Sequence, residues 1–134
     1  MDRIILDTNL WISFLISKKF HKLDSFILNN KVKLIFSQEL LEEFITVINR
    51  PKFKKFFNKK DINLLLELFD IYGELIDVKS VVNLCRDPKD NFLLALAKDS
   101  KADFLLSGDQ DLLDIKKIGK AKILSLNEYI VSKQ

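Results

Sequence analysis

Residues 4–12 read IILDTNLWI, and this stretch sets the fold class. The apolar run that precedes Asp7 predicts a buried strand, and the apolar residues that follow it recur with helical spacing. Asp7 therefore stands where a strand gives way to a helix. Two explanations fit this acid: it caps the helix, or it belongs to a set of acids brought together for chemistry. The other acids of the chain bear on the choice.

Strand and helix patterns alternate along all 134 residues. Strands are expected at residues 3–7, 33–36, 75–78, 103–106 and 122–124. Helices are expected at residues 9–17, 22–29, 38–49, 51–57, 61–74, 88–100 and 126–131. Strands separated by helices need crossover connections, which predict a mostly parallel sheet of about five strands with helices on both faces. We therefore expect an α/β fold with α/β/α layers, formed by residues 1–134 as a single domain.

The composition indicates a globular protein without a membrane span. Hydrophobic residues make up 48% and charged residues 31% of the chain, and no apolar stretch is long enough to cross a bilayer. The N-terminus has no cleavable signal pattern. Cys85 is the only cysteine, which excludes an internal disulfide and a multi-cysteine metal site. The single histidine, His21, excludes a mechanism that needs two histidines. We expect a cytoplasmic protein.

Acids follow four of the predicted strands. They are Asp7; Glu39, Glu42 and Glu43; Asp87 and Asp90; and Asp109 and Asp111. Because the carboxyl ends of parallel strands meet at one edge of a sheet, we expect these segments to converge there.

Helical phase separates inward-pointing acids from ordinary surface acids. Glu43 lies beside Val47, on the apolar side of its helix, and Asp90 shares a stripe with the buried side of the next one. Both are therefore candidates for a site. Asp87 precedes Pro88, a typical helix cap, and an acid such as Asp90 is also favourable in a first helical turn.

The stretch SGDQD contributes the last two acids. Gly108 would permit a sharp turn that brings Asp109 to the strand tip. Asp111 could instead cap a short turn over residues 112–115. We take Asp109 as the first candidate and Asp111 as the second.

A cluster of four such carboxylates has an expected chemistry. Neighbouring negative charges repel, and no arginine or lysine in the sequence is evidently dedicated to them. A divalent cation is the natural partner, and ligands that are all oxygen favour Mg²⁺ or Mn²⁺. Carboxylate-held Mg²⁺ serves phosphodiester hydrolysis by activating water and stabilising charge on the reacting oxygens.

A basic segment interleaved with Phe53, Phe56 and Phe57 lies between residues 50 and 60. Its cations are Arg50, Lys52, Lys54, Lys55, Lys59 and Lys60. Cations and aromatic rings together suit the backbone and bases of a nucleic acid. A short helix with phenylalanines in the core and lysines in water explains the same pattern, and the two interpretations are compatible.

Four motifs carry a resemblance to a known family. IILDTNLWISFL, SQELLEEF, RDPKDNFLLALA and FLLSGDQDLL, in this order and spacing, resemble the PIN domain family, and within it the toxin components of bacterial and archaeal toxin–antitoxin pairs. The resemblance covers nearly the whole chain. It implies a PIN-like α/β/α nuclease domain, a metal-dependent endoribonuclease that hydrolyses RNA phosphodiesters with Mg²⁺ or Mn²⁺.

The resemblance also implies roles for individual residues. Asp7, Glu43, Asp90 and Asp109 match the catalytic, metal-binding acids, Asn9 and Ser107 match supporting polar residues, and Asp87 and Asp111 rank lower. In the mechanism that we expect, the basic segment, with Lys116, Lys117 and Lys120, would hold the RNA backbone. A homodimer and a small antitoxin are the implied partners.

Two alternatives remain open. A catalytically silent RNA-binding or interaction module could keep the PIN fold. An aspartyl-phosphate receiver or phosphatase is also α/β, but Asp7 is followed by Thr8 and Asn9 rather than a second acid, and Ser125 rather than lysine follows the last strand. Because Asn9 could cap the helix instead, we expect Asp7 to serve as the central metal ligand.

Overall fold

The computed structural model describes residues 1–17, 29 and 31–133. His21, and all of the helix expected over residues 22–29 except Asn29, lie outside the described residues.

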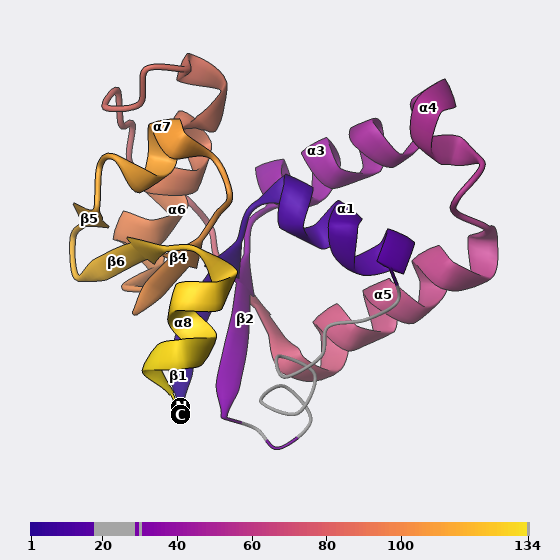
Figure 1. Cartoon of the computed structure of the whole chain (residues 1–134), viewed down its shortest axis with the longest axis horizontal. Coiled ribbons are helices and arrows are strands. Elements are labelled where there is room, and N and C mark those ends of the chain that lie inside the picture. Colours follow the sequence, from indigo (N-terminus) through magenta and orange to yellow (C-terminus); the bar gives the residue numbers. More distant parts are fainter. Residues whose placement is uncertain (18–28, 30, 134) are drawn as a thin grey trace.

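A mostly parallel sheet forms the centre of the molecule (Figure 1). In the described part of the chain its six strands are β1 (Asp2–Leu6), β2 (Val32–Phe36), β3 (Gly73–Leu75), β4 (Phe104–Leu106), β5 (Lys117–Ile118) and β6 (Ala121–Leu124). Their order is β3-β2-β1-β4-β6-β5, and the pairings are parallel except that of β5 with β6. β1 and β4 are neighbours, with Leu6 opposite Leu106, so the segments that follow them leave the sheet side by side.

Helices cover both faces of the sheet. They are α1 (Thr8–Ser17), α3 (Gln38–Ile48), α4 (Pro51–Lys54), α5 (Lys59–Tyr72), the 3₁₀ turn η1 (Pro88–Asp90), α6 (Asn91–Ser100), α7 (Gln110–Leu113) and α8 (Leu126–Ser132). Ile4 and Leu6 of β1 belong to a core shared with α1, α3, α5 and α8, whereas Ile5 belongs to a core shared with α6 and α7. Alternate strand residues thus feed two cores, which confirms the predicted α/β/α layers.

The sheet has one strand more than the sequence indicates. The additional strand, β5, forms a tight hairpin with β6 through Gly119, whose φ is 59°. Two residues are too few to produce a recognisable alternation of polar and apolar side chains.

The third strand is predicted at residues 75–78 and lies at Gly73–Leu75. A Cβ on Gly73 would lie 2.5 Å from the carbonyl oxygen of Phe69 and 2.8 Å from the Phe36 ring. Glycine is therefore what lets α5 pass directly into β3.

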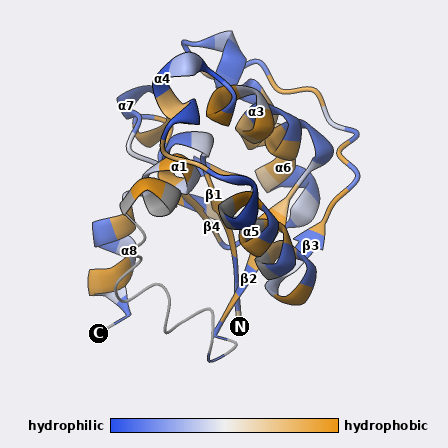
Figure 2. Cartoon of the chain, turned by 90° about the vertical axis from the view of Figure 1, so that its right-hand side faces the viewer, coloured by the Kyte–Doolittle hydropathy of each residue, from blue (hydrophilic) through white to orange (hydrophobic). Residues whose placement is uncertain are grey.

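The helices α3, α4 and α5 form an arm that extends away from the sheet, with α1 packed against α3 (Figure 1). Along α3, Leu40, Phe44, Val47 and Ile48 are buried, and Figure 2 shows hydrophobic and hydrophilic residues alternating along α3 and α5. The helix expected over residues 51–57 ends at Lys54. Among the described residues, no helix combines the length and apolarity that crossing a bilayer requires.

Candidate functional site

The predicted acids share one cleft at the carboxyl edge of the sheet. The cleft has a volume of about 420 Å³. Among the residues that the structure describes, those that line the cleft include Asp7, Asn9, Glu43, Asp87, Asp90 and Asp109. Asp7 follows β1 and Asp109 follows β4, while Glu43 comes from α3 and Asp90 from the end of η1. Four segments distant in sequence are thus brought together, as the parallel topology predicts.

Asp7 is buried and held from two sides. Its exposed fraction is 4%. Its Oδ1 accepts a 2.8 Å hydrogen bond from the Leu10 amide, and its Oδ2 accepts one from the Ser107 hydroxyl. Burial raises the pKa of Asp7, and hydrogen bonds from Ser107 and the Leu10 and Gly108 amides oppose that rise. The carboxyl group is therefore fixed in orientation while its charged form remains costly.

The bond from the Leu10 amide makes Asp7 itself the cap of α1. The expectation that Asn9 could take over this role is wrong, because α1 already begins at Thr8. Asn9 is exposed and faces the cleft. Asp7 therefore caps α1 and also lines the cleft with the other acids.

Ser107 connects two of the acids. It is fully buried, donates its hydroxyl proton to Asp7, and accepts a 2.9 Å hydrogen bond from the Asp109 amide. One side chain thus links the tip of β1 to the start of α7. Gly108 is not needed for a positive φ here, and a Cβ at its position would meet no atom within 4 Å.

Asp109, not Asp111, caps α7. Its extended backbone precedes Gln110, and its Oδ1 accepts a 3.0 Å hydrogen bond from the Asp111 amide. The predicted turn over residues 112–115 therefore starts two residues earlier. Asp111 is not among the described residues that line the cleft; its carboxylate pairs with Arg86 at 3.0 Å.

Asp87 behaves as the sequence predicts. It caps η1 by accepting a 3.1 Å hydrogen bond from the Lys89 amide, and it also lines the cleft. The helix expected over residues 88–100 begins with this 3₁₀ turn and continues as α6 from Asn91.

Asp90 carries the strongest electrostatic perturbation of the four acids. Burial raises its pKa to about 7, helped by the neighbouring Asp109 carboxyl group and by the charges of Asp87 and Glu43. Carboxyl groups this close resist simultaneous ionisation. The groups around Asp90 therefore do not neutralise its negative charge, and its ionised form is costly.

Glu43 is half-buried, and burial raises its pKa as well. The Arg50 charge partly opposes this rise. Arg50, Lys52 and Lys89 also line the cleft. Arg50 follows the end of α3 and acts on Glu43 through its charge.

Comparison with known proteins assigns the family. A model of the PIN domain matches residues 3–111. This chain belongs to the PIN domain family. PIN domains are nucleases, generally ribonucleases, and generally depend on a divalent metal. The assignment confirms the resemblance and favours a nuclease over a receiver or phosphatase.

Two relatives of this PIN domain show how far the likeness extends. The uncharacterized protein MJ1680 of Methanocaldococcus jannaschii is 30% identical over 128 residues, which span 93% of this chain and 81% of that protein. A chain of VapBC2 from Rickettsia felis, solved bound to a DNA fragment from their promoter, has a similar fold with a TM-score of 0.60 and 15% identity. The alignment covers 90% of this chain and 96% of that one.

The acids of this PIN domain suit a hydrated divalent cation better than a closed cage. Among the described residues, no group of three or more histidine, cysteine or acidic side chains is already arranged to bind a metal. Asp90 and Asp109 form a close pair, whereas both oxygens of Asp7 already accept hydrogen bonds. Because Mg²⁺ in proteins is usually held by one or two carboxylates and retains several waters, this donor set fits it.

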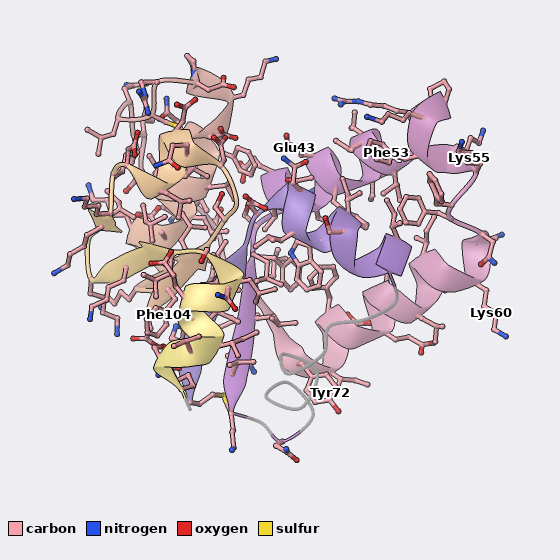
Figure 3. The ribbon with its side chains drawn as sticks, viewed as in Figure 1. Glu43, Phe53, Lys55, Lys60, Tyr72 and Phe104 are labelled. Carbon is pink, nitrogen blue, oxygen red and sulfur yellow. The ribbon has the colours of Figure 1, made fainter. Side chains whose placement is uncertain are left out.

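The basic segment of the PIN domain divides into two parts. Arg50, Lys52 and Phe53 line the cleft, whereas Lys54, Lys55, Lys59 and Lys60 are exposed and are not among its described lining residues. Figure 3 shows Lys55 and Lys60 at the outer end of the arm, farther from Glu43 than Phe53 is. The interpretation of this segment as a core helix is also incomplete, because Phe53 and Phe57 pack against the core while Phe56 is 46% exposed.

Lys120 lies away from this edge. It precedes β6 and pairs with Asp103, which precedes β4, at 3.1 Å. Both residues therefore lie at the amino end of the sheet, opposite the cleft, so Lys120 is badly placed for the RNA contact that we expected of it.

Proposed function

We propose that this PIN domain is an endoribonuclease that depends on Mg²⁺ or Mn²⁺ and uses Asp7, Glu43, Asp90 and Asp109. The observation that carries the proposal is the gathering of these four acids in one cleft, with the pKa of Asp90 raised to about 7. Keeping carboxyl groups together in this costly state is understandable if a cation joins them during function.

Asp90 and Asp109 are the proposed direct ligands, because they already form a close pair. Asp7 completes the site from the tip of β1, directly or through water. When bound, the ion would activate water and stabilise negative charge on the phosphate oxygens.

The remaining groups orient and hold. Ser107 and the Leu10 amide fix the Asp7 carboxyl group, so that it does not need to reorganise when the ion arrives. Glu43 is suited to orient the attacking water and accept its proton, since a raised pKa makes a carboxylate a better base. The charge of Arg50 favours the ionised form of Glu43 that this role requires.

Arg50, Lys52 and Lys89 are proposed to bind the RNA backbone beside the acids. They line the same cleft. Cations that share a cleft with a carboxylate cluster can attract phosphates that the acids alone would repel. Lys54, Lys55, Lys59 and Lys60 would extend this attraction along the arm.

A toxin role in a cytoplasmic toxin–antitoxin pair is part of the proposal. The sequence resemblance to toxin components and the fold similarity to VapBC2 support it. A small antitoxin and a homodimer are the partners proposed on the same grounds.

The test is cleavage of RNA by the wild type in Mg²⁺ or Mn²⁺, compared with Asp7→Asn and Asp90→Asn. We expect cleavage by the wild type and a loss of about 100-fold or more in each variant, because the charge that holds the ion is removed. Asp103→Asn is the matched control, since Asp103 precedes the strand that Asp109 follows. It should retain activity.

The alternative is a catalytically silent RNA-binding module. The two hydrogen bonds that already occupy the Asp7 oxygens favour it, because they serve the fold whether or not a metal binds. If wild type and Asp7→Asn leave several RNAs equally intact in both metals, the nuclease proposal is wrong and this alternative takes its place.

A further inference from the structure

The lining of the cleft includes apolar residues that the acid chemistry does not use. They are Val47, Phe53 and Leu93, and the cations Arg50 and Lys52 line the same cleft. Phe53 belongs to α4, the short helix that follows α3 along the arm. Phe53 is the only aromatic residue among the described residues that line the cleft, and its ring offers a flat apolar surface in the same cleft as the acids.

A second phenylalanine of the same segment provides an internal comparison. The Lys52 Nζ lies 5.4 Å from the ring centre of Phe53, and the Lys55 Nζ lies 5.2 Å from that of Phe56. The two pairs are alike in chemistry. Phe53 lines the cleft, whereas Phe56 is not among its described lining residues.

We propose that Phe53 stacks against a nucleobase of the bound RNA, and that this contact makes the enzyme select unpaired nucleotides. The inference rests on the proposed ribonuclease function. The ring sits beside the acids in one cleft, so the stacked base would belong to a nucleotide close to the cleaved phosphodiester. Every base offers a π-face, so this contact selects strand state rather than sequence.

A preference for unpaired RNA follows because a base must expose one of its faces in order to stack on a protein ring. Within a duplex both faces of a base are covered by its neighbours, and stacking on a protein ring requires the base to leave that stack. An unpaired nucleotide does not need to break base pairs in order to stack on the ring. A protein that relies on Phe53 therefore binds loops, bulges and single strands better than helices.

In the free protein, the Lys52 side chain covers the Phe53 ring, which is the surface on which a base would stack. Its ammonium covers a face of the Phe53 ring and is exposed. A base that takes this face displaces the ammonium group, and the flexible lysine can then bind an adjoining phosphate. The cation–π contact of the free protein thus occupies the place of the base.

The first measurement is binding of a short fluorescent RNA strand of mixed sequence, single or annealed to its complement, by proteins that carry Asp7→Asn to prevent cleavage. We expect Phe53→Leu to weaken binding of the single strand about 5- to 100-fold and binding of the duplex far less, because stacking on one base is removed. Phe56→Leu is the control and should leave both affinities within about twofold. Equal effects of the two substitutions, or equal losses for single strand and duplex, would overturn the proposal.

The second measurement does not depend on a loss of packing. Phe53→Trp places an indole in the cleft, and the native Trp11 is buried and supplies a constant background. We expect the single strand to quench the fluorescence of Phe53→Trp but not that of Phe56→Trp. Quenching of neither, or of both equally, would refute stacking at Phe53 even if Phe53→Leu fails to fold.

These results are separable from the test of cleavage. Intact nuclease activity with no specific effect at Phe53 refutes the platform and leaves the proposed function standing. Specific quenching at Phe53 in a protein that cleaves no RNA supports the platform and refutes the nuclease.

Discussion

The two ends of the central strands carry the same residue type in opposite electrostatic states. At the amino end, Asp103 accepts a 2.8 Å hydrogen bond from the Arg3 amide and pairs with Lys120 at 3.1 Å. Burial raises the pKa of Asp103, but these partners outweigh burial and leave it lowered. At the carboxyl end, Asp90 meets other carboxyl groups and its pKa is raised to about 7.

The same contrast extends across the amino end. Asp2 accepts a hydrogen bond from the Tyr129 hydroxyl and pairs with Lys133, both at 2.8 Å. Arg3 pairs with Glu74 at 2.6 Å and donates to the Ser100 carbonyl oxygen. Acids at the amino end are paired with cations of the chain, whereas Asp90 in the cleft has other carboxyl groups as neighbours, so its ionised form is costly. Metal, mutation, pH and salt should each act differently on the two ends.

The largest expected effect is stabilisation by metal. Millimolar Mg²⁺ or Mn²⁺ should raise the melting temperature of the wild type, because the ion binds the folded cluster; at one hundred times the dissociation constant the gain is about 2.7 kcal/mol. Asp7→Asn should lose most of this gain, and Asp103→Asn should keep it. Thermal unfolding with and without metal measures both. An unchanged wild-type melting temperature would show that the acids of the cleft do not bind the metal.

The next largest effect lies at the amino end. Arg3→Met removes the partner of Glu74 and two hydrogen bonds to Ser100, and we expect the free energy of unfolding to fall by about 1–2 kcal/mol. Lys120→Met breaks a more exposed pair and should cost less than about 1 kcal/mol. Urea unfolding measures both losses. Neither change should reduce the stabilisation by metal; if either does, the two ends are not independent.

The pH dependence of the metal-free protein separates the ends further. The pKa of Asp90 is about 7 in the folded state against an ordinary value of 3.8, so the unfolded chain loses this proton first as the pH rises. Stability is therefore highest below about pH 4 with respect to this group, and falls between about pH 4 and 7.

Asp90→Asn should flatten that fall and stabilise the metal-free protein at pH 7 by about 1 kcal/mol, after allowance for screening by solvent. Chemical unfolding in a chelator at several pH values measures the slope. A slope that Asp90→Asn leaves unaltered would show that the carboxyl groups of the cleft do not interact as described.

The smallest effect concerns salt. Reversing Lys54 and Lys55 to glutamate should weaken RNA binding and lower its dependence on salt, by about 0.7 in the log–log slope for each phosphate that the protein no longer neutralises. Lys120→Glu, at the opposite end of the sheet, should leave the slope unchanged. Binding titrations over a range of salt concentrations measure this. Equal slopes for wild type and the double reversal would restrict RNA binding to the cleft.

The local sequence pattern predicts the helices, the strands and the positions of the acids. It does not predict the individual side-chain contacts between them. The strand–helix alternation and the acids after the strands are visible in the sequence, because periodicity and parallel topology act along or between whole elements. The capping of α7 by Asp109 is not, since either of two nearby acids could satisfy the same amides. At Asp7 the sequence suggests a choice between capping and chemistry, although the two oxygens and their separate partners allow both.

The basic, aromatic lining of the cleft shows the limit most clearly. Arg50 and Phe53 are visible as part of a basic, aromatic segment, but their separation from Lys55 and Phe56 depends on where α4 ends and how the arm is directed. Nothing in the spacing of lysines and phenylalanines encodes that direction.

The bridge through Ser107 has a consequence for the order in which the protein is made. Ser107 bonds to Asp7 across 100 positions of the chain, and β4 pairs directly with β1. A growing chain that has not yet reached Ser107 has Asp7, Glu43 and Asp90, but lacks both the hydroxyl that holds Asp7 and the carboxylate of Asp109. The cleft stays incomplete until synthesis has passed Asp109, so a nuclease of the proposed kind would be inactive in a nascent chain that has not reached that residue.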